Sequence, residues 1–221
     1  VRARPGIAAA VTNHTYTGAM LTQPYRAATT LERPDIDRMK GLAKQAVEGT
    51  GYKCYQTHPE FTYDPKKAIG GVWADTLCTI FGIPGYTLEL WDPFGHAGIE
   101  VEKPIDAFIS PTVEMLRSLI GTFAEDPDAI QGWTTVEHPQ LGTVEVGGLD
   151  YQRTIRNPPE AHLAAECERG HTVAWRIARS IPRLQVHTRL ESLSEGVQQL
   201  EIIIENLGYL PTPGLDRAAQ I

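Results

Sequence analysis

The chain has 221 residues, of which 42% are hydrophobic, and a formal net charge of −7. This length can bury a substantial core in one large or two small domains. The acidic balance argues against a nucleic-acid partner, and the lack of a long apolar run argues against a membrane-spanning segment. Three cysteines without metal-ligand spacing argue against a disulfide scaffold. We therefore expect a soluble protein whose compartment, secreted or cytoplasmic, the sequence leaves open.

Strands alternate with helices in the first part of the chain, which favours an α/β fold. Residues 7–11 are a continuous run of small apolar side chains, typical of a central strand buried on both faces. The other expected elements, recognised by apolar spacing and by Gly, Pro and capping residues, are a helix from Asp35 or Asp37 to Val47, a loop at 52–72, a helix at 74–81, a strand at 86–91, and a helix capped by Ser110 ahead of Pro111.

The pattern changes near residue 128, where we place a domain boundary. Residues 133–148 have a strand-and-turn composition, and residues 160–180 have the spacing of a helix. Two alternating segments around the Glu195-Gly196 turn predict a β-hairpin. The expected architecture is a mixed, mostly parallel sheet with flanking helices over 1–127, followed by a smaller β-rich accessory domain over 128–221. On the helix predicted at 160–180, the residues expected to face inward are Leu163, Cys167, Ala174, Ile177 and Ala178.

His14 and Glu89 are the two residues most suggestive of chemistry. His14 follows the first apolar run, and parallel sheets place their ligands just beyond the ends of strands. It is a metal ligand or an ordinary loop histidine. Glu89 lies between Leu88 and Leu90, where burial would raise the pKa of its carboxyl group and suit a general base. The alternative is a solvent-facing strand residue, since Thr87, Glu89 and Trp91 share one face.

Three segments together resemble the zinc carboxypeptidases of the M14 type. Residues 12–21, TNHTYTGAML, are similar to the strand-end segment that carries the third zinc ligand of that family. Residues 82–92, GIPGYTLELWD, are similar to the segment with the catalytic glutamate, and the separation of 75 positions (89 − 14) is close to the family's spacing. Gly70-Gly71 with Asp75 resembles the Gly-rich stretch before that glutamate. The resemblance covers roughly residues 1–125.

The resemblance implies definite roles for several residues. His14 would be a Zn²⁺ ligand, and Glu89 would activate the zinc-bound water and pass its proton to the leaving amine. Tyr63 would close over the C-terminal carboxylate of a peptide or protein substrate, and Ala74 would lie in the specificity pocket. Tyr16, within the zinc-ligand segment, would be a further substrate contact. Asp75 either caps or orients the helix that follows it.

The chain also departs from this family. The His-x-x-Glu clip that supplies the first two zinc ligands, and the arginines that hold the substrate carboxylate, lie upstream of the His14 segment in the family and have no counterpart here. One ligand cannot hold a catalytic zinc, which needs about three. We therefore expect the C-terminal part of a longer carboxypeptidase, inactive by itself. Two alternatives stay open: a non-catalytic peptide- or glycan-binding module, and an amide-cleaving deacylase of the same fold.

Overall fold

The computed structural model describes residues 6–64, 66, 67 and 69–221, so the first residues of the chain and part of the 52–72 segment lie outside it. Its centre is a four-stranded sheet in the order β1-β4-β2-β3. The strands are β1 (Ala10–Thr15), β2 (Ala19–Thr22), β3 (Lys53–Gln56) and β4 (Gly85–Leu90). β1 pairs with β4, and β2 with β3, in parallel, whereas β2 and β4 are antiparallel. The mixed, mostly parallel sheet with flanking helices is thereby confirmed.

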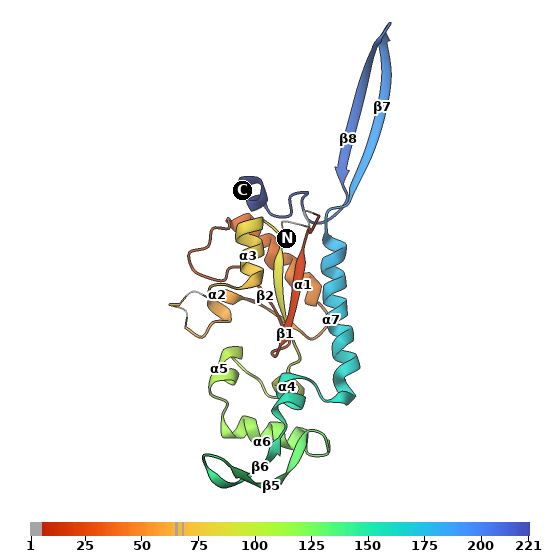
Figure 1. Ribbon diagram of the computed structural model, residues 1–221. Coiled ribbons are helices and arrows are strands. Elements are labelled where there is room, and N and C mark those ends of the chain that lie inside the picture. Colours follow the sequence, from red (N-terminus) through yellow and green to blue (C-terminus); the bar gives the residue numbers. More distant parts are fainter. Residues whose placement is uncertain (1–5, 65, 68) are drawn as a thin grey trace.

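Helices α1 (Arg33–Val47), α3 (Trp73–Phe81) and α7 (Glu160–Ser180) pack around this sheet (Figure 1). Tyr86 and Leu88 are two residues apart on β4, so they share the face that α1 and α7 cover. The shared core contains side chains from the sheet, from both helices and from the end of the chain: Met20, Met39, Leu42, Tyr86, Leu88, Val173, Ile177, Leu210 and Leu215. The boundary near residue 128 stays a prediction, but α7 and the C-terminal segment complete the core of the sheet.

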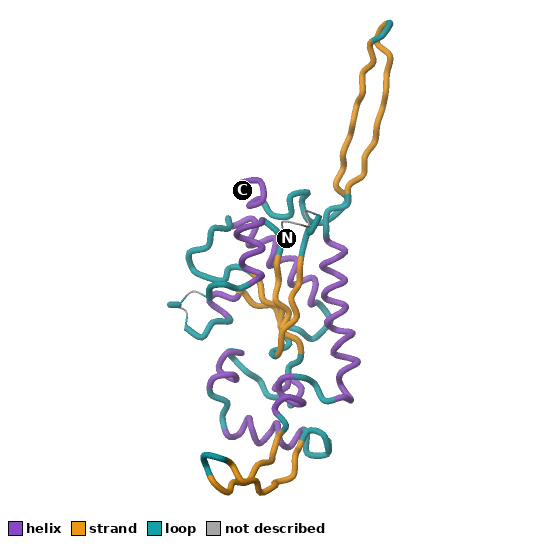
Figure 2. The backbone as a smooth tube through the Cα atoms, viewed as in Figure 1, coloured by secondary structure: helices purple, strands orange, loops and turns teal. Residues whose placement is uncertain are grey.

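A second group of elements lies below the sheet in Figures 1 and 2. It comprises α4 (Pro93–His96), α5 (Pro104–Ile109), α6 (Val113–Thr122), β5 (Ile130–His138), β6 (Gly142–Leu149) and the π-helical turn η1 (Gln152–Arg156). Its apolar cluster includes Trp91, Phe94, Leu119, Phe123 and Ile155. The remaining elements are the short helix α2 (Thr57–Glu60), the hairpin of β7 (Leu184–Ser194) and β8 (Val197–Asn206), and η2 (Asp216–Gln220).

Several sequence expectations need correction. The first strand begins at Ala10 rather than residue 7, and it is a half-buried edge strand rather than a central one. His14 therefore lies within the strand and not beyond it. The four-residue strands β2 and β3 were not expected, and β3 falls in the segment assigned to a loop. Short strands give too few residues for a period of two to be recognised.

Two helices also differ in detail from their prediction. The helix expected after Ser110 begins at Val113, and its cap is Thr112, whose hydroxyl accepts a hydrogen bond from the Met115 amide. Helix α7 has the expected bounds, but its buried residues are Glu166, Gly170, Val173, Ile177 and Ser180. Of the expected inward set only Ile177 is buried, because a glutamate and a glycine occupy positions on the core-facing stripe.

Candidate functional site

His14 and Glu89 lie side by side at the C-terminal ends of two neighbouring parallel strands. The register of β1 and β4 pairs His14 directly with Glu89. Paired residues of neighbouring strands point to the same face of a sheet, and Nδ1 of His14 is 3.8 Å from Oε1 of Glu89. The fold therefore brings together the two residues that the sequence singled out, at the edge where α/β sheets bind their ligands.

The two side chains differ strongly in exposure. The side chain of His14 is 55% exposed, whereas that of Glu89 is 12% exposed. Burial raises the pKa of Glu89 to about 7, and the positive charge of Arg156 acts in the opposite direction. The side chain of Glu89 is therefore mostly buried and does not face solvent. A carboxyl group with this pKa is populated in both protonation states near neutral pH, as proton transfer requires.

Tyr16, two residues after His14, is buried in the apolar cluster that contains Trp91 and Phe94. The Thr15–Tyr16 peptide is cis, and the amide of Thr17 donates to the carbonyl of Trp91 over 2.7 Å. This bond ties the segment after His14 to the segment after Glu89. Burial and a hydrogen bond with Tyr151 raise the pKa of the Tyr16 hydroxyl. The cavity beside Tyr16 has a volume of only ≈ 30 Å³, which is room for about one water molecule.

Tyr63 and Ala74 are placed very differently. The side chain of Tyr63 is 68% exposed, and its hydroxyl is near enough to Tyr16 to contribute to the raised pKa there. Ala74 is fully buried, and its carbonyl oxygen lies 2.8 Å from the position that a Cβ atom on Gly85 would take. Gly85 begins β4, four residues before Glu89, so Ala74 packs away from the His14–Glu89 pair.

Asp75 is a buried carboxylate and does not cap α3, whose N-cap is Val72. It accepts hydrogen bonds from Nε2 of Gln23 over 3.1 Å and from Nη2 of Arg26 over 2.5 Å. The prediction that Asp75 caps the following helix is therefore wrong. Asp75 instead fixes the segment that follows β2. That segment includes Tyr25, whose hydroxyl lies 3.2 Å from Oγ1 of Thr87.

Residues from the C-terminal half of the chain hold the end of β4 in place, and they could not be found from the sequence. Trp91, two residues after Glu89, has a φ of 60°, which bulky residues rarely adopt. Its amide donates to Oε1 of Glu166 over 2.6 Å, and its indole Nε1 donates to the carbonyl of Thr154 over 2.7 Å. These bonds hold the end of β4 against α7 and η1.

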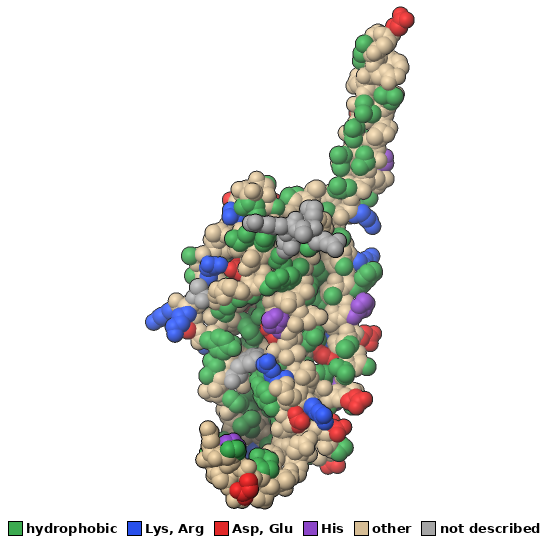
Figure 3. Space-filling model, viewed as in Figure 1, with side chains coloured by type: hydrophobic (Ala, Val, Ile, Leu, Met, Phe, Trp, Pro, Cys, Tyr) green, Lys and Arg blue, Asp and Glu red, His purple; other side chains and the backbone are tan. Residues whose placement is uncertain are grey.

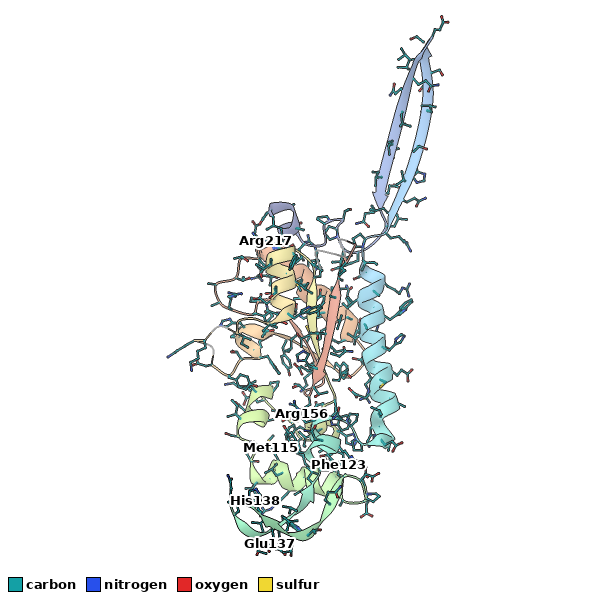
Figure 4. All side chains as sticks on the ribbon, in the orientation of Figure 1. Met115, Phe123, Glu137, His138, Arg156 and Arg217 are labelled. Carbon is teal, nitrogen blue, oxygen red and sulfur yellow. The ribbon has the colours of Figure 1, made fainter. Side chains whose placement is uncertain are left out.

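Arg156 ends η1 close to the lower end of the sheet, as Figure 4 shows. Its charge lowers the pKa of both Glu89 and Tyr16. Neither Arg156 nor Glu166 belongs to a motif, and their interactions with Glu89, Tyr16 and Trp91 span more than sixty residues, so no local pattern marks them.

The described residues do not form a complete zinc site. No group of three or more histidine, cysteine, aspartate or glutamate residues is placed to share a metal ion in the part of the chain that the structure describes. A catalytic zinc needs about three protein ligands, and His14 would supply one. Zinc therefore does not fit the described residues by themselves.

Glu89 also makes the stability of the fold depend on pH. The pKa of Glu89 is about 7 in the folded chain, against an ordinary value of 4.5, so the folded state binds the proton more tightly than the unfolded state. The resulting stabilisation is complete below pH 4.5 and is lost as the pH rises to about 7. Because one pKa unit corresponds to about 1.4 kcal/mol, the effect is on the order of 3 kcal/mol.

We expect the Glu89→Gln variant, which cannot ionise, to gain unfolding free energy relative to the wild type as the pH rises through this window. Urea denaturation at closely spaced pH values measures the difference. Glu100→Gln removes an exposed carboxylate and serves as the control that should follow the wild type. A difference between Glu89→Gln and wild type that stays constant with pH would contradict the raised pKa.

No protein-family model matches the chain, and no curated protein matches it either. Among the described residues, none of the helices combines the length and the hydropathy needed to cross a lipid bilayer.

Proposed function

We propose that this chain carries the proton-transfer half of a peptidase site of the zinc-carboxypeptidase type, which removes C-terminal residues from peptides or proteins. The observation that carries the proposal is the His14–Glu89 pair, with its 3.8 Å separation and its position at the ends of two parallel strands. The resemblance of both segments to the M14 carboxypeptidases supports it, because the same two residues correspond to a zinc ligand and a catalytic glutamate there.

Glu89 has the properties of a general base. In its ionised form it can accept a proton from the water that attacks the peptide carbonyl, and it can then donate that proton to the leaving amine. The pKa of about 7 lets it take both roles near neutral pH. Trp91 and the hydrogen bonds that fix its backbone hold the end of β4, and with it the carboxylate, in place.

His14 is proposed as a metal ligand, in the neutral form that metals bind. The other ligands would have to come from residues outside those that the structure describes, since the described residues lack a three-ligand group. We accordingly expect the purified chain to show no peptidase activity by itself. The same incomplete ligand set favours a second candidate function, a binding module that holds a peptide or glycan without cleaving it.

Two peptides, one with a free and one with an amidated C-terminus, distinguish a carboxypeptidase from a deacylase and from a binding module. A protein that combines this chain with the remaining ligands should release the last residue from a peptide with a free C-terminal carboxylate. The same peptide with an amidated C-terminus should stay intact, because a carboxypeptidase recognises the carboxylate. Mass spectrometry of both reactions gives the answer. Cleavage of an acyl amide in place of the C-terminal bond would indicate a deacylase, and binding without any cleavage would indicate the binding module.

A further inference from the structure

The β7–β8 hairpin projects from the body of the molecule, and every residue of both strands is exposed. Figure 3 shows hydrophobic side chains along its length. A two-stranded ribbon of this kind is marginally stable in water unless another surface covers it. Apolar surface concentrated in this way marks an interaction site.

The strand register separates the hairpin into an apolar face and a polar face. Residue pairs along the ribbon alternate between the two faces. The apolar face consists of five cross-strand rows: Leu184 with Asn206, Val186 with Ile204, Thr188 with Ile202, Leu190 with Leu200, and Ser192 with Gln198. The polar face carries Gln185 with Glu205, His187 with Ile203, Arg189 with Glu201, and Glu191 with Gln199. All charged side chains of these rows are therefore on one side.

Some of the charged side chains of the polar face form ion pairs within the ribbon itself. Nε2 of His187 lies 3.4 Å from Glu205, and Nη2 of Arg189 lies 3.6 Å from Glu191. The six aliphatic side chains of the apolar face are each between 51% and 62% exposed. A partner for this face must therefore be apolar and uncharged, because a charge placed against it would be desolvated without an opposite charge.

We propose that the apolar face of the β7–β8 hairpin binds the same face of a second copy of this chain, in a two-fold symmetric dimer. The two ribbons lie face to face and run in opposite directions, with the row of Thr188 and Ile202 on the symmetry axis. Ile202 then faces its own counterpart. The row of Val186 and Ile204 faces the row of Leu190 and Leu200.

The sequence of the rows makes the face complementary to itself. Aliphatic rows meet aliphatic rows on both sides of the axis. The outermost rows, which contain Asn206 and Gln198, meet each other, and the Asn206 amide is already hydrogen-bonded to the backbone of its own chain. Because the ribbon extends away from the body (Figure 1), the two bodies lie at opposite ends of the paired ribbons. A two-fold interface requires this kind of self-complementarity.

The size of the face sets the expected strength of the dimer. Ten residues at about 3.4 Å each give a ribbon about 34 Å long, and two strands give a width of about 10 Å. Two such faces cover on the order of 700 Å² in projection, to which the relief of the side chains adds. Stable interfaces bury about 1,200 Å² or more, so the dimer is reversible and its population depends on concentration.

Sedimentation velocity of the 221-residue chain, from about 5 to about 500 µM, tests this proposal. The wild type should pass from monomer to dimer as the concentration rises. Ile202→Arg places two positive charges opposite each other on the axis and should stay monomeric over the whole range. Ile203→Arg makes the same chemical change on the polar face and should dimerise like the wild type. Both side chains are exposed, at 54% and 50%.

Leu200→Lys provides a second disruption of the apolar face and should also stay monomeric. Circular dichroism and urea denaturation of each variant verify that the body is folded. A wild type that remains monomeric at the highest concentration would overturn the proposal. Equal loss of dimer in Ile202→Arg and Ile203→Arg would overturn it too, as would growth beyond the dimer, which indicates pairing of strand edges.

Discussion

Glu89→Gln is expected to lower the rate of C-terminal peptide hydrolysis by about 10²–10⁴-fold, the usual contribution of a general base. Glutamine has nearly the same shape as glutamate but cannot accept a proton from water. His14 is unchanged in this variant, so zinc binding should be retained. The measurements are kcat with a free-C-terminus peptide and zinc stoichiometry by atomic absorption, in a protein that supplies the remaining ligands.

Glu100→Gln is the control for this experiment, because it removes one exposed carboxylate that lies outside β4. It should retain full activity. Wild-type turnover by Glu89→Gln would eliminate Glu89 as the base. Loss of zinc together with activity would instead give Glu89 a role in holding the metal.

Glu166→Ala is expected to lower the unfolding free energy of the chain by about 3 kcal/mol. The buried carboxylate of Glu166 accepts hydrogen bonds from the Tyr52 hydroxyl and from the Trp91 amide. Alanine leaves both buried donors without their acceptor, at about 1–3 kcal/mol each. Arg169, the third partner, is about half exposed and can turn to water, so its contribution is small.

Urea denaturation measures this loss, with Glu168→Ala as the matched variant. Glu168 is an exposed glutamate two positions further along the same helix, and its removal should change the unfolding free energy by about 0.5 kcal/mol or less. If the two variants were equally stable, Glu166 would have no part in joining α7 to the sheet.

The strongly periodic elements of the fold could be predicted from the sequence. Helix α7 has the expected bounds, α3 ends at Gly82 in the left-handed conformation, and the β7–β8 turn falls at Glu195 and Gly196. In each case a local signal, either apolar spacing or a glycine at the end of an element, determines the structure. The proximity of His14 and Glu89 was also expected, from their resemblance to known segments and not from periodicity.

Contacts between residues that are far apart in the sequence could not be predicted from local patterns. Glu166 is a charged residue in a helix, which on composition alone belongs on the solvent side, yet its Oε1 accepts from the Tyr52 hydroxyl and the Trp91 amide, which lie next to β3 and β4. Asp75 looks like a helix cap and instead binds Gln23 and Arg26. The edge position of β1 depends on which strands neighbour it, and no feature of a single strand records its neighbours.

The shared core also constrains when the chain can fold. Met39 and Leu42 of α1 and Tyr86 of β4 pack against Val173 of α7 and Leu215 near the chain's end. The amides of Asp216 and Arg217 donate to the carboxylate of Asp35 over 2.8 and 3.0 Å, which joins segments about 180 residues apart. During synthesis the apolar faces of α1 and β4 emerge long before the residues that cover them. Closing such distant contacts is slow, so the nascent chain exposes this apolar surface until residues 173–217 have been synthesised, and it is prone to aggregate over that interval.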